Sequence, residues 1–186
     1  MIRYAITDPS FFTTTADKIK YLNSVNADYV LFRDKISSNY KEQAIDFLNL
    51  SSRLGFKKII HTDYNLADTI NADGVHLTFD DIENIPIAKK LALFVVVSTH
   101  SIKQIELAKS LGADAVTFSP IFDTPNKGRA KGITELEKAI ECCDIKIIAL
   151  GGIVTKEHID SVSKTNAYGF ASIRYFANST SNKNLI

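Results

Sequence analysis

The chain has 186 residues, a net charge of +1 and a hydrophobic content of 45%, which suffices for the buried core of one domain covering residues 1–186. It has no block of like charges, which argues against binding to nucleic acid or to a membrane surface, and no apolar run approaches the ~20 residues that cross a membrane. The two cysteines, Cys142 and Cys143, are adjacent and poorly placed for a disulfide, so we expect a reducing, cytoplasmic location.

Short apolar runs bounded by turn residues predict eight strands, and helical patterns follow most of the early ones. The runs do not alternate with polar residues, as expected when both faces of each strand are covered. In chain order the predicted strands are Ile2–Thr7, Tyr29–Phe32, Lys57–His61, Gly74–Leu77, Leu93–Val97, Ala115–Phe118, Ile145–Leu150 and Gly169–Ser172. The predicted helices are Thr14–Ser24, Tyr40–Leu54, Tyr64–Ile70, a segment near Asp80–Leu91 that Pro86 disturbs, and Ser101–Leu111.

A short phrase occurs four times and predicts how the strands are arranged. Its copies begin at Asn26, Asn71, Gly112 and Asn166, at intervals of 45, 41 and 54 residues. Each copy opens with Asn or Gly, which tolerate the left-handed conformation that closes a helix, and then enters an apolar run. An interval of this length fits two βα units, and four repeats of the phrase therefore fit eight. The sequence therefore predicts an α/β fold, a single compact (βα)8 TIM barrel.

In such barrels the chemistry takes place where the strands end. The residues that follow the predicted strands include two cation-bearing segments, several carboxylates and a pair of glycines. Carboxylates with few other hard ligands suit Mg²⁺, while Arg and Lys bind phosphate oxygens. Glycines after the seventh strand match the usual phosphate site of this barrel, because the backbone can approach an anion there. The strand ends therefore predict two phosphate-bearing ligands, one of them with a metal ion.

Several of these residues also have structural interpretations. Thr78 and Asp81 have the spacing of a capping box, and Asp63 could cap the next short helix. His76 lies within a strand and is expected to be a packed core residue. His61 and His100 stand at strand ends, where we expect a structural or binding role rather than a catalytic one.

A set of short motifs covers nearly the whole chain and resembles the thiamine phosphate synthase superfamily, which also contains the bacterial thiazole tautomerases. The motifs are Phe32-Arg33-Asp34-Lys35, Asp63, Ala72-Asp73-Gly74-Val75-His76-Leu77 with Asp81, Val97-Ser98-Thr99-His100-Ser101, Gly112-Ala113-Asp114, Pro120-Ile121-Phe122-Asp123-Thr124-Pro125-Asn126-Lys127 and Ala149-Leu150-Gly151-Gly152-Ile153.

The resemblance implies a transferase of thiamine biosynthesis. It would join hydroxymethylpyrimidine diphosphate to hydroxyethylthiazole phosphate, giving thiamine phosphate and pyrophosphate. The resemblance implies Mg²⁺ as cofactor and small phosphorylated substrates. The sequence leaves the oligomeric state open, and a homodimer is one possibility. The implied metal ligands are Asp63 and Asp81, the implied diphosphate-binding catalytic residues are Arg33, Lys35, Ser98 and Lys127, and the other implied substrate-binding residues are Thr62, His100, Thr124, Asn126, Gly151, Gly152 and Ser172.

Three departures from the family pattern leave alternatives open. Leu31 replaces a usual Gln and Thr62 a usual Asn, which removes amide groups that would recognise the aminopyrimidine ring. Pro120 stands where the tautomerases carry a histidine, although His100 or His61 could substitute for it. The alternatives to a synthase are therefore a thiazole tautomerase and a non-catalytic paralogue that binds a phosphate ligand. Retention of both predicted metal ligands favours the synthase.

Overall fold

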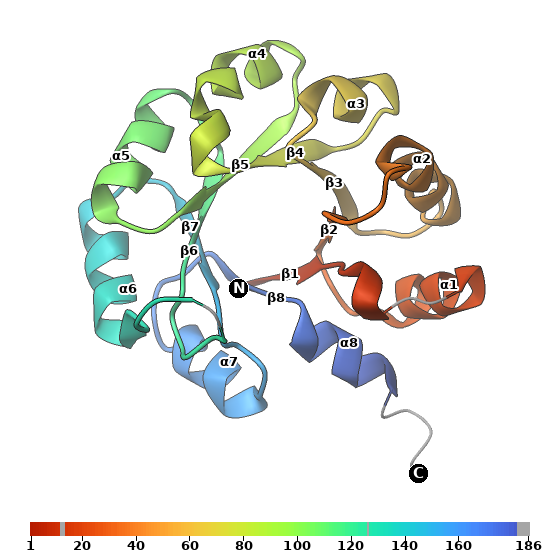
Figure 1. Ribbon diagram of the computed structural model, residues 1–186. Helices are drawn as coiled ribbons and strands as arrows, with labels where there is room; N and C mark the ends of the chain where they lie inside the picture. Colours follow the sequence, from red (N-terminus) through yellow and green to blue (C-terminus); the bar gives the residue numbers. More distant parts are fainter. Residues whose placement is uncertain (12–13, 126, 182–186) are drawn as a thin grey trace.

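Eight parallel strands close into one barrel in the order β1 to β8, and β8 pairs with β1. This arrangement is seen in a computed structural model that describes residues 1–11, 14–125 and 127–181. Figure 1 shows the helices in a ring around the strands, with α8 between α7 and α1. The predicted βα barrel is confirmed, whereas its extent as one domain over residues 1–186 stays a prediction.

The elements follow one another as β1 (Ile2–Ile6), η1 (Pro9–Phe11), α1 (Thr15–Ser24), β2 (Tyr29–Phe32), α2 (Tyr40–Leu50), β3 (Lys57–His61), α3 (Tyr64–Thr69), β4 (Gly74–Leu77), η2 (Phe79–Asn84), α4 (Ile85–Lys90), β5 (Phe94–Thr99), α5 (Ile102–Ser110), β6 (Ala115–Phe118), α6 (Gly132–Cys142), β7 (Lys146–Leu150), α7 (Lys156–Ser163), β8 (Gly169–Ser172) and α8 (Arg174–Ser181). The elements η1 and η2 are 3₁₀ helices. No helix within the described ranges is long and apolar enough to span a membrane.

Two predicted elements were wrong in ways that have a physical cause. The segment predicted as one helix disturbed by Pro86 is η2 followed by α4, and Pro86 lies in the first turn of α4. Proline is tolerated there because the first N–H groups of a helix have no partner within the helix. The strand β5 continues to Thr99, so Ser98 lies within the strand and not after it.

Two layers of apolar side chains hold the barrel. The larger layer lies between the strands and the surrounding helices, and the smaller one fills the inside of the barrel. The buried residues of the inner layer are Tyr4, Ile6, Leu31, Ile59, Val96, Ala115, Ile148 and Ala171. Because this layer closes the inside of the barrel, a ligand can reach only the residues at its mouth, the end at which the strands finish.

Candidate functional site

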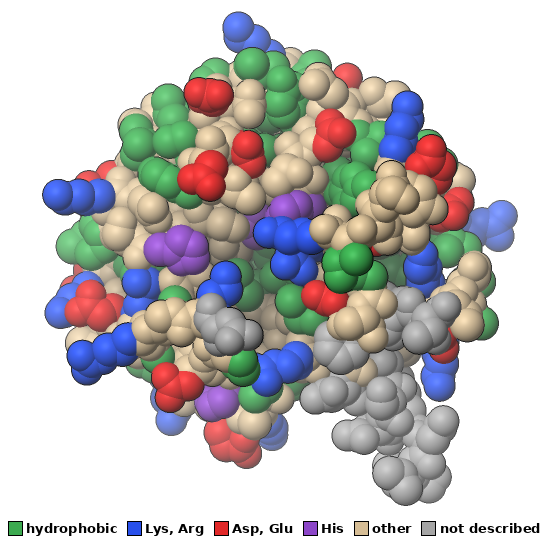
Figure 2. Space-filling view, in the orientation of Figure 1, with side chains coloured by type: hydrophobic (Ala, Val, Ile, Leu, Met, Phe, Trp, Pro, Cys, Tyr) green, Lys and Arg blue, Asp and Glu red, His purple; other side chains and the backbone are tan. Residues whose placement is uncertain are grey.

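A group of charged side chains meets at the mouth of the barrel, and we call it the basic side. It consists of Arg33, Lys35, His61, Asp81 and Lys127. Partial burial, together with the positive charges of Arg33 and Lys127, lowers the pKa of Lys35, which places these three cations close to one another. Figure 2 shows Lys, Arg and His side chains around a hollow near the middle of the molecule. Like charges that crowd together in this way favour a polyanionic ligand.

His61 lies within this group at the end of β3. Burial, followed by the positive charges of Lys35 and Arg33, lowers its pKa from 6.5 to about 4, and the negative charge of Asp81 opposes the shift. The imidazole is therefore neutral at pH 7. A neutral ring can donate or accept a hydrogen bond at the mouth without adding to the positive charge.

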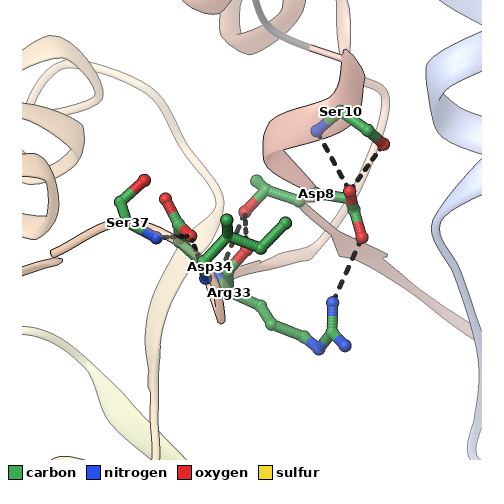
Figure 3. Close-up of polar contacts among 7 residues, drawn as sticks. Asp8, Ser10, Arg33, Asp34 and Ser37 are labelled. Carbon is green, nitrogen blue, oxygen red and sulfur yellow. Dashed lines mark hydrogen bonds and ion pairs between the residues drawn. The ribbon is translucent and has the colours of Figure 1, made fainter.

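Arg33 is held in place by the end of β1 (Figure 3). Its Nη1 lies 3.2 Å from Oδ2 of Asp8, and its backbone N–H donates to the Thr7 hydroxyl at 2.9 Å. The other oxygen of Asp8 accepts from the Ser10 hydroxyl at 2.6 Å and from its backbone N–H at 3.1 Å. The sequence prediction missed Asp8, although this residue directly follows the predicted strand Ile2–Thr7 and its position alone could have identified it.

The two predicted metal ligands stand after neighbouring strands, Asp63 after β3 and Asp81 after β4. Asp63 Oδ1 accepts from the Leu66 backbone N–H at 2.8 Å, so this residue also caps α3. Asp81 Oδ2 accepts from the Thr78 hydroxyl at 2.5 Å, and Thr78 makes no side-chain cap, so the full capping box does not form.

Each of these carboxylates has a second oxygen for which the described part of the chain provides no hydrogen-bond partner. Among the same residues, no group of three or more acidic, His or Cys side chains could hold a metal ion. Mg²⁺ is usually bound by one or two carboxylates together with substrate phosphates. The donor set therefore fits an Mg²⁺ ion that is shared with a phosphate ligand.

Thr62, which precedes Asp63, has an unusual backbone conformation. Its φ is 60°, in the left-handed region that β-branched residues rarely adopt. Its hydroxyl donates to the carbonyl of His61 at 2.8 Å. Asn tolerates this region better than Thr, so the substitution at this position leaves the backbone strained beside the predicted metal ligand.

Ser98 is half-buried at the end of β5 and contacts the predicted core histidine, His76. The His76 Nε2 and Ser98 Oγ atoms are 3.0 Å apart, and His76 is only 2% exposed, which confirms its burial. Thr117 pairs in register with Ser98, and its buried Oγ1 has no partner among the described residues. Thr117 is fully buried, and the sequence prediction did not include it because it lies within β6 and not after it.

The other half of the mouth, which we call the packed side, consists of Thr124, Gly151, Gly152 and Ser172. Both glycines have positive φ, 95° and 69°. A Cβ on Gly151 would lie 2.7 Å from Cα of Pro120, and one on Gly152 would lie 2.7 Å from the backbone of Phe122. These glycines are therefore required by the loop that follows β6, which lies directly on them, whatever ligand binds there.

The hydroxyl groups of the packed side are engaged within the protein. Ser172 Oγ donates to the carbonyl of Ile153 at 2.7 Å and accepts from the Tyr175 backbone N–H at 3.1 Å. Thr124 Oγ1 donates to the carbonyl of Phe122 at 2.9 Å. The side chains thus tie the strand ends to the loops, and the free groups available to a phosphate on this side are backbone groups.

The predicted residue His100 lies apart from both sides. His100 is exposed, and its Nδ1 is 3.0 Å from the carbonyl oxygen of Ser119, with no contact to the basic side within the described residues. Asn126 lies outside the described residues.

Comparison with known proteins shows which family the chain belongs to. Residues 3–176 match the family described as thiamine monophosphate synthase. The chain belongs to the thiamine monophosphate synthase family.

Individual relatives agree with this assignment. A thiamine-phosphate synthase from Limosilactobacillus reuteri is 30% identical over 153 residues, which are 76% of this chain and 71% of the relative. A second thiamine-phosphate synthase proposed in Aquifex aeolicus is 36% identical over 121 residues, which are 63% of this chain and 64% of that protein, or just under two thirds of it. The structure of thiamine phosphate pyrophosphorylase from Pyrococcus furiosus has a TM-score of 0.81 at 25% identity and covers 96% of this chain and 91% of the neighbour.

Membership of the thiamine monophosphate synthase family supports an enzyme of thiamine biosynthesis, as the sequence motifs implied. The structure places two departures from the family pattern at or below the mouth. Leu31 lies in the inner layer, 1% exposed, so it offers no polar group to a ligand. Pro120 is buried under Gly151, where it contributes packing and no acid or base.

Proposed function

We propose that this chain is a thiamine phosphate synthase that joins hydroxymethylpyrimidine diphosphate to hydroxyethylthiazole phosphate. The observation that supports this most strongly is the basic side of the mouth. Arg33, Lys35 and Lys127 lie close together, and Asp81 lies near His61 of the same group. Asp63 and Asp81 follow the neighbouring strands β3 and β4, and the described residues leave one oxygen of each without a hydrogen-bond partner. This is the arrangement that a diphosphate with Mg²⁺ requires.

In the proposed reaction the thiazole nitrogen bonds to the methylene carbon of the pyrimidine, and the bond from that carbon to the diphosphate oxygen breaks. The electron pair of the broken bond stays on the diphosphate. Arg33, Lys35, Ser98 and Lys127 would bind the leaving diphosphate, and preorganised cations stabilise the charge that develops on it. The ring nitrogen is already nucleophilic, so no general base is required.

Asp63 and Asp81 would hold Mg²⁺, which when bound neutralises charge on the diphosphate. The two carboxylates, which follow adjacent strands, would each provide an oxygen ligand, and the substrate would provide others. The thiazole phosphate would bind on the packed side, to the backbone groups of Gly151 and Gly152 and to Thr124 and Ser172. Asn126, which lies outside the described residues, is proposed to bind the same phosphate.

For Thr62 and His100 we propose only a position relative to the substrates. Thr62 would border the pyrimidine ring, without the amide that the family pattern usually has at this position. His100 would act at the exposed edge of the mouth. We further propose that the protein is cytoplasmic and works as a monomer or a homodimer.

A thiazole tautomerase is the second candidate, because His61 brings an imidazole to the end of β3 among the residues of the basic side, where it could serve as the acid–base group. Its lowered pKa makes it a weak base at pH 7, which ranks this candidate below the synthase. Pro120 provides no such group where the tautomerases have a histidine. A tautomerase moves a proton within one substrate and needs no metal ion.

The experiment that separates these functions offers both substrates with Mg²⁺ and measures thiamine phosphate and pyrophosphate. A parallel assay follows isomerisation of a thiazole carboxylate phosphate. A synthase produces both products in equal amounts and stops when a chelator is added. Isomerisation that continues with the chelator supports the tautomerase instead, and ligand binding without either reaction supports a non-catalytic paralogue.

A further inference from the structure

Three side chains from three strands form a continuous hydrogen-bonded chain inside the barrel. The Tyr4 hydroxyl of β1 lies 3.0 Å from Nδ1 of His76 in β4, and Nε2 of His76 lies 3.0 Å from Oγ of Ser98 in β5. The rings of Tyr4 and His76 are stacked, with centroids 5.7 Å apart at an angle of 14°. Tyr4 and His76 are 1% and 2% exposed, so only Ser98 reaches the mouth.

The burial of this chain fixes its protonation. Burial, aided by the nearby His61 and Arg33, lowers the pKa of His76 to about 3, so its ring is neutral at pH 7. Burial, aided by Tyr29, raises the pKa of Tyr4, so its hydroxyl keeps its proton. A neutral imidazole has one N–H group and one acceptor nitrogen, and its two hydrogen bonds must therefore run in the same direction.

The partners of Tyr4 decide that direction. Within the described residues, His76 Nδ1 is the one hydrogen-bond partner of the Tyr4 hydroxyl. If this hydroxyl accepted a hydrogen bond from Nδ1, its own proton would be buried with no acceptor, which is costly. Tyr4 therefore donates to Nδ1, and Nε2 carries the proton of the ring.

We infer that Tyr4 and His76 are positioning residues that turn the hydroxyl proton of Ser98 toward the ligand. Because Ser98 Oγ accepts from Nε2 of His76, its own O–H group is left to donate to an oxygen at the mouth. In the opposite tautomer Ser98 would donate to the histidine and present only lone pairs to an anion. This inference rests on the proposed function, which assigns Ser98 to the diphosphate.

Binding of Mg²⁺-pyrophosphate to three variants tests the inference. Ser98→Ala removes the donor, and Tyr4→Phe removes only the hydroxyl that fixes the tautomer while the stacked ring remains. Each is expected to weaken binding on the order of tenfold, the usual effect of losing one hydrogen bond to a charged group. The double variant is expected to bind no more weakly than Ser98→Ala, because the two changes act on the same hydrogen bond.

Tyr29→Phe is the matched control. Tyr29 is a neighbouring tyrosine inside the barrel whose hydroxyl lies 3.4 Å from that of Tyr168 and has no contact with His76. This variant is expected to bind Mg²⁺-pyrophosphate like the wild type. Thermal unfolding of all variants identifies any effect that comes from loss of stability.

Nitrogen NMR of the His76 ring gives a readout that packing alone would not change. The wild type should carry its proton on Nε2, and Tyr4→Phe should show both tautomers or a shift to Nδ1. A proton on Nδ1 in the wild type would overturn the inference. So would a Tyr4→Phe effect that is equally large in the Ser98→Ala background.

The same data separate this inference from the proposed function. If the wild type forms thiamine phosphate but Ser98→Ala binds pyrophosphate normally, the function stands and the role of the hydrogen-bonded chain is wrong. If the wild type neither turns over nor binds Mg²⁺-pyrophosphate, the function fails and the inference fails with it.

Discussion

The two sides of the barrel mouth differ in what their functional groups already contact. On the packed side, the hydroxyls of Thr124 and Ser172 are bonded to backbone groups, and the loop after β6 fills the space beside Gly151 and Gly152. On the basic side, partial burial and then the like charges of Arg33 and Lys127 lower the pKa of Lys35. The contacts of the packed side thus stabilise the fold. The clustered cations of the basic side instead lower the free energy of unfolding, and binding of an anionic ligand would restore it.

This difference predicts that substitutions on the packed side have their main effect on the free energy of unfolding. Gly152→Val is expected to lower the free energy of unfolding by about 3 kcal/mol or more, through a clash with Phe122 and a strained positive φ. Denaturant unfolding measures this directly. Gly55→Ala is the control, because a Cβ there meets nothing within 4 Å. Equal stability of both variants would contradict the description of the packed side.

On the basic side, acid should weaken the fold through His61. Its pKa in the folded chain, about 4, is below the ordinary 6.5, so the unfolded chain binds more protons between these values. The stability that depends on neutral His61 is complete above pH 6.5 and is lost as the pH falls toward 4, on the order of 1–2 kcal/mol between pH 7 and pH 5.

Unfolding measured across this pH range checks the effect. His61→Gln is expected to reduce the slope without abolishing it, because the buried His76 also has a lowered pKa and contributes over the same pH range. His100→Gln, at the exposed edge of the mouth, is expected to leave the slope unchanged. An identical slope in His61→Gln would show that burial at the mouth does not keep this ring neutral.

Removal of one cation should separate binding from stability. Lys35→Met is expected to weaken pyrophosphate binding about tenfold, or by ~1.4 kcal/mol, because it removes a charged donor. Its free energy of unfolding should stay the same or rise slightly, since Arg33 and Lys127 lose a like-charged neighbour. Lys20→Met, on the exposed surface of α1, changes the net charge equally and should leave binding intact. A destabilised Lys35→Met protein would mean that this lysine is structural.

The smallest expected change comes from Thr62. Thr62→Asn is expected to stabilise the fold by about 1 kcal/mol, because Asn adopts a φ of 60° with less strain. Asn71 has nearly the same φ, 56°, after α3, so Asn71→Thr should destabilise the fold by a similar amount. Opposite signs in thermal unfolding would support strain at Thr62, and a loss of stability in Thr62→Asn would contradict it.

The sequence predicted the barrel and its basic side because strand ends meet at one face whenever strands are parallel. That rule brought Arg33, Lys35 and Lys127 together without any knowledge of side-chain contacts. It missed Asp8, which belongs to the same face, and Thr117, which lies within a strand.

The remaining features of the fold and of the site depend on tertiary contacts, which a local sequence pattern does not contain. The helix α8 lies in a polar segment, and its Phe176 packs against Phe170 of β8, with ring centroids 5.7 Å apart. The glycine pair was visible in the sequence, but the loop that covers it was not. The partners of Ser172 come from Ile153 and Tyr175, so its engagement within the protein could be seen only in the fold.

The central claim is that the basic side binds a diphosphate together with Mg²⁺, and calorimetry of pyrophosphate binding tests it most directly. The wild type should bind pyrophosphate more tightly with Mg²⁺ than with a chelator. Asp81→Asn should lose most of that difference at little cost in stability, because the amide oxygen can still accept from Thr78. Equal affinity with and without Mg²⁺ in the wild type, or full Mg²⁺ dependence in Asp81→Asn, would contradict the claim.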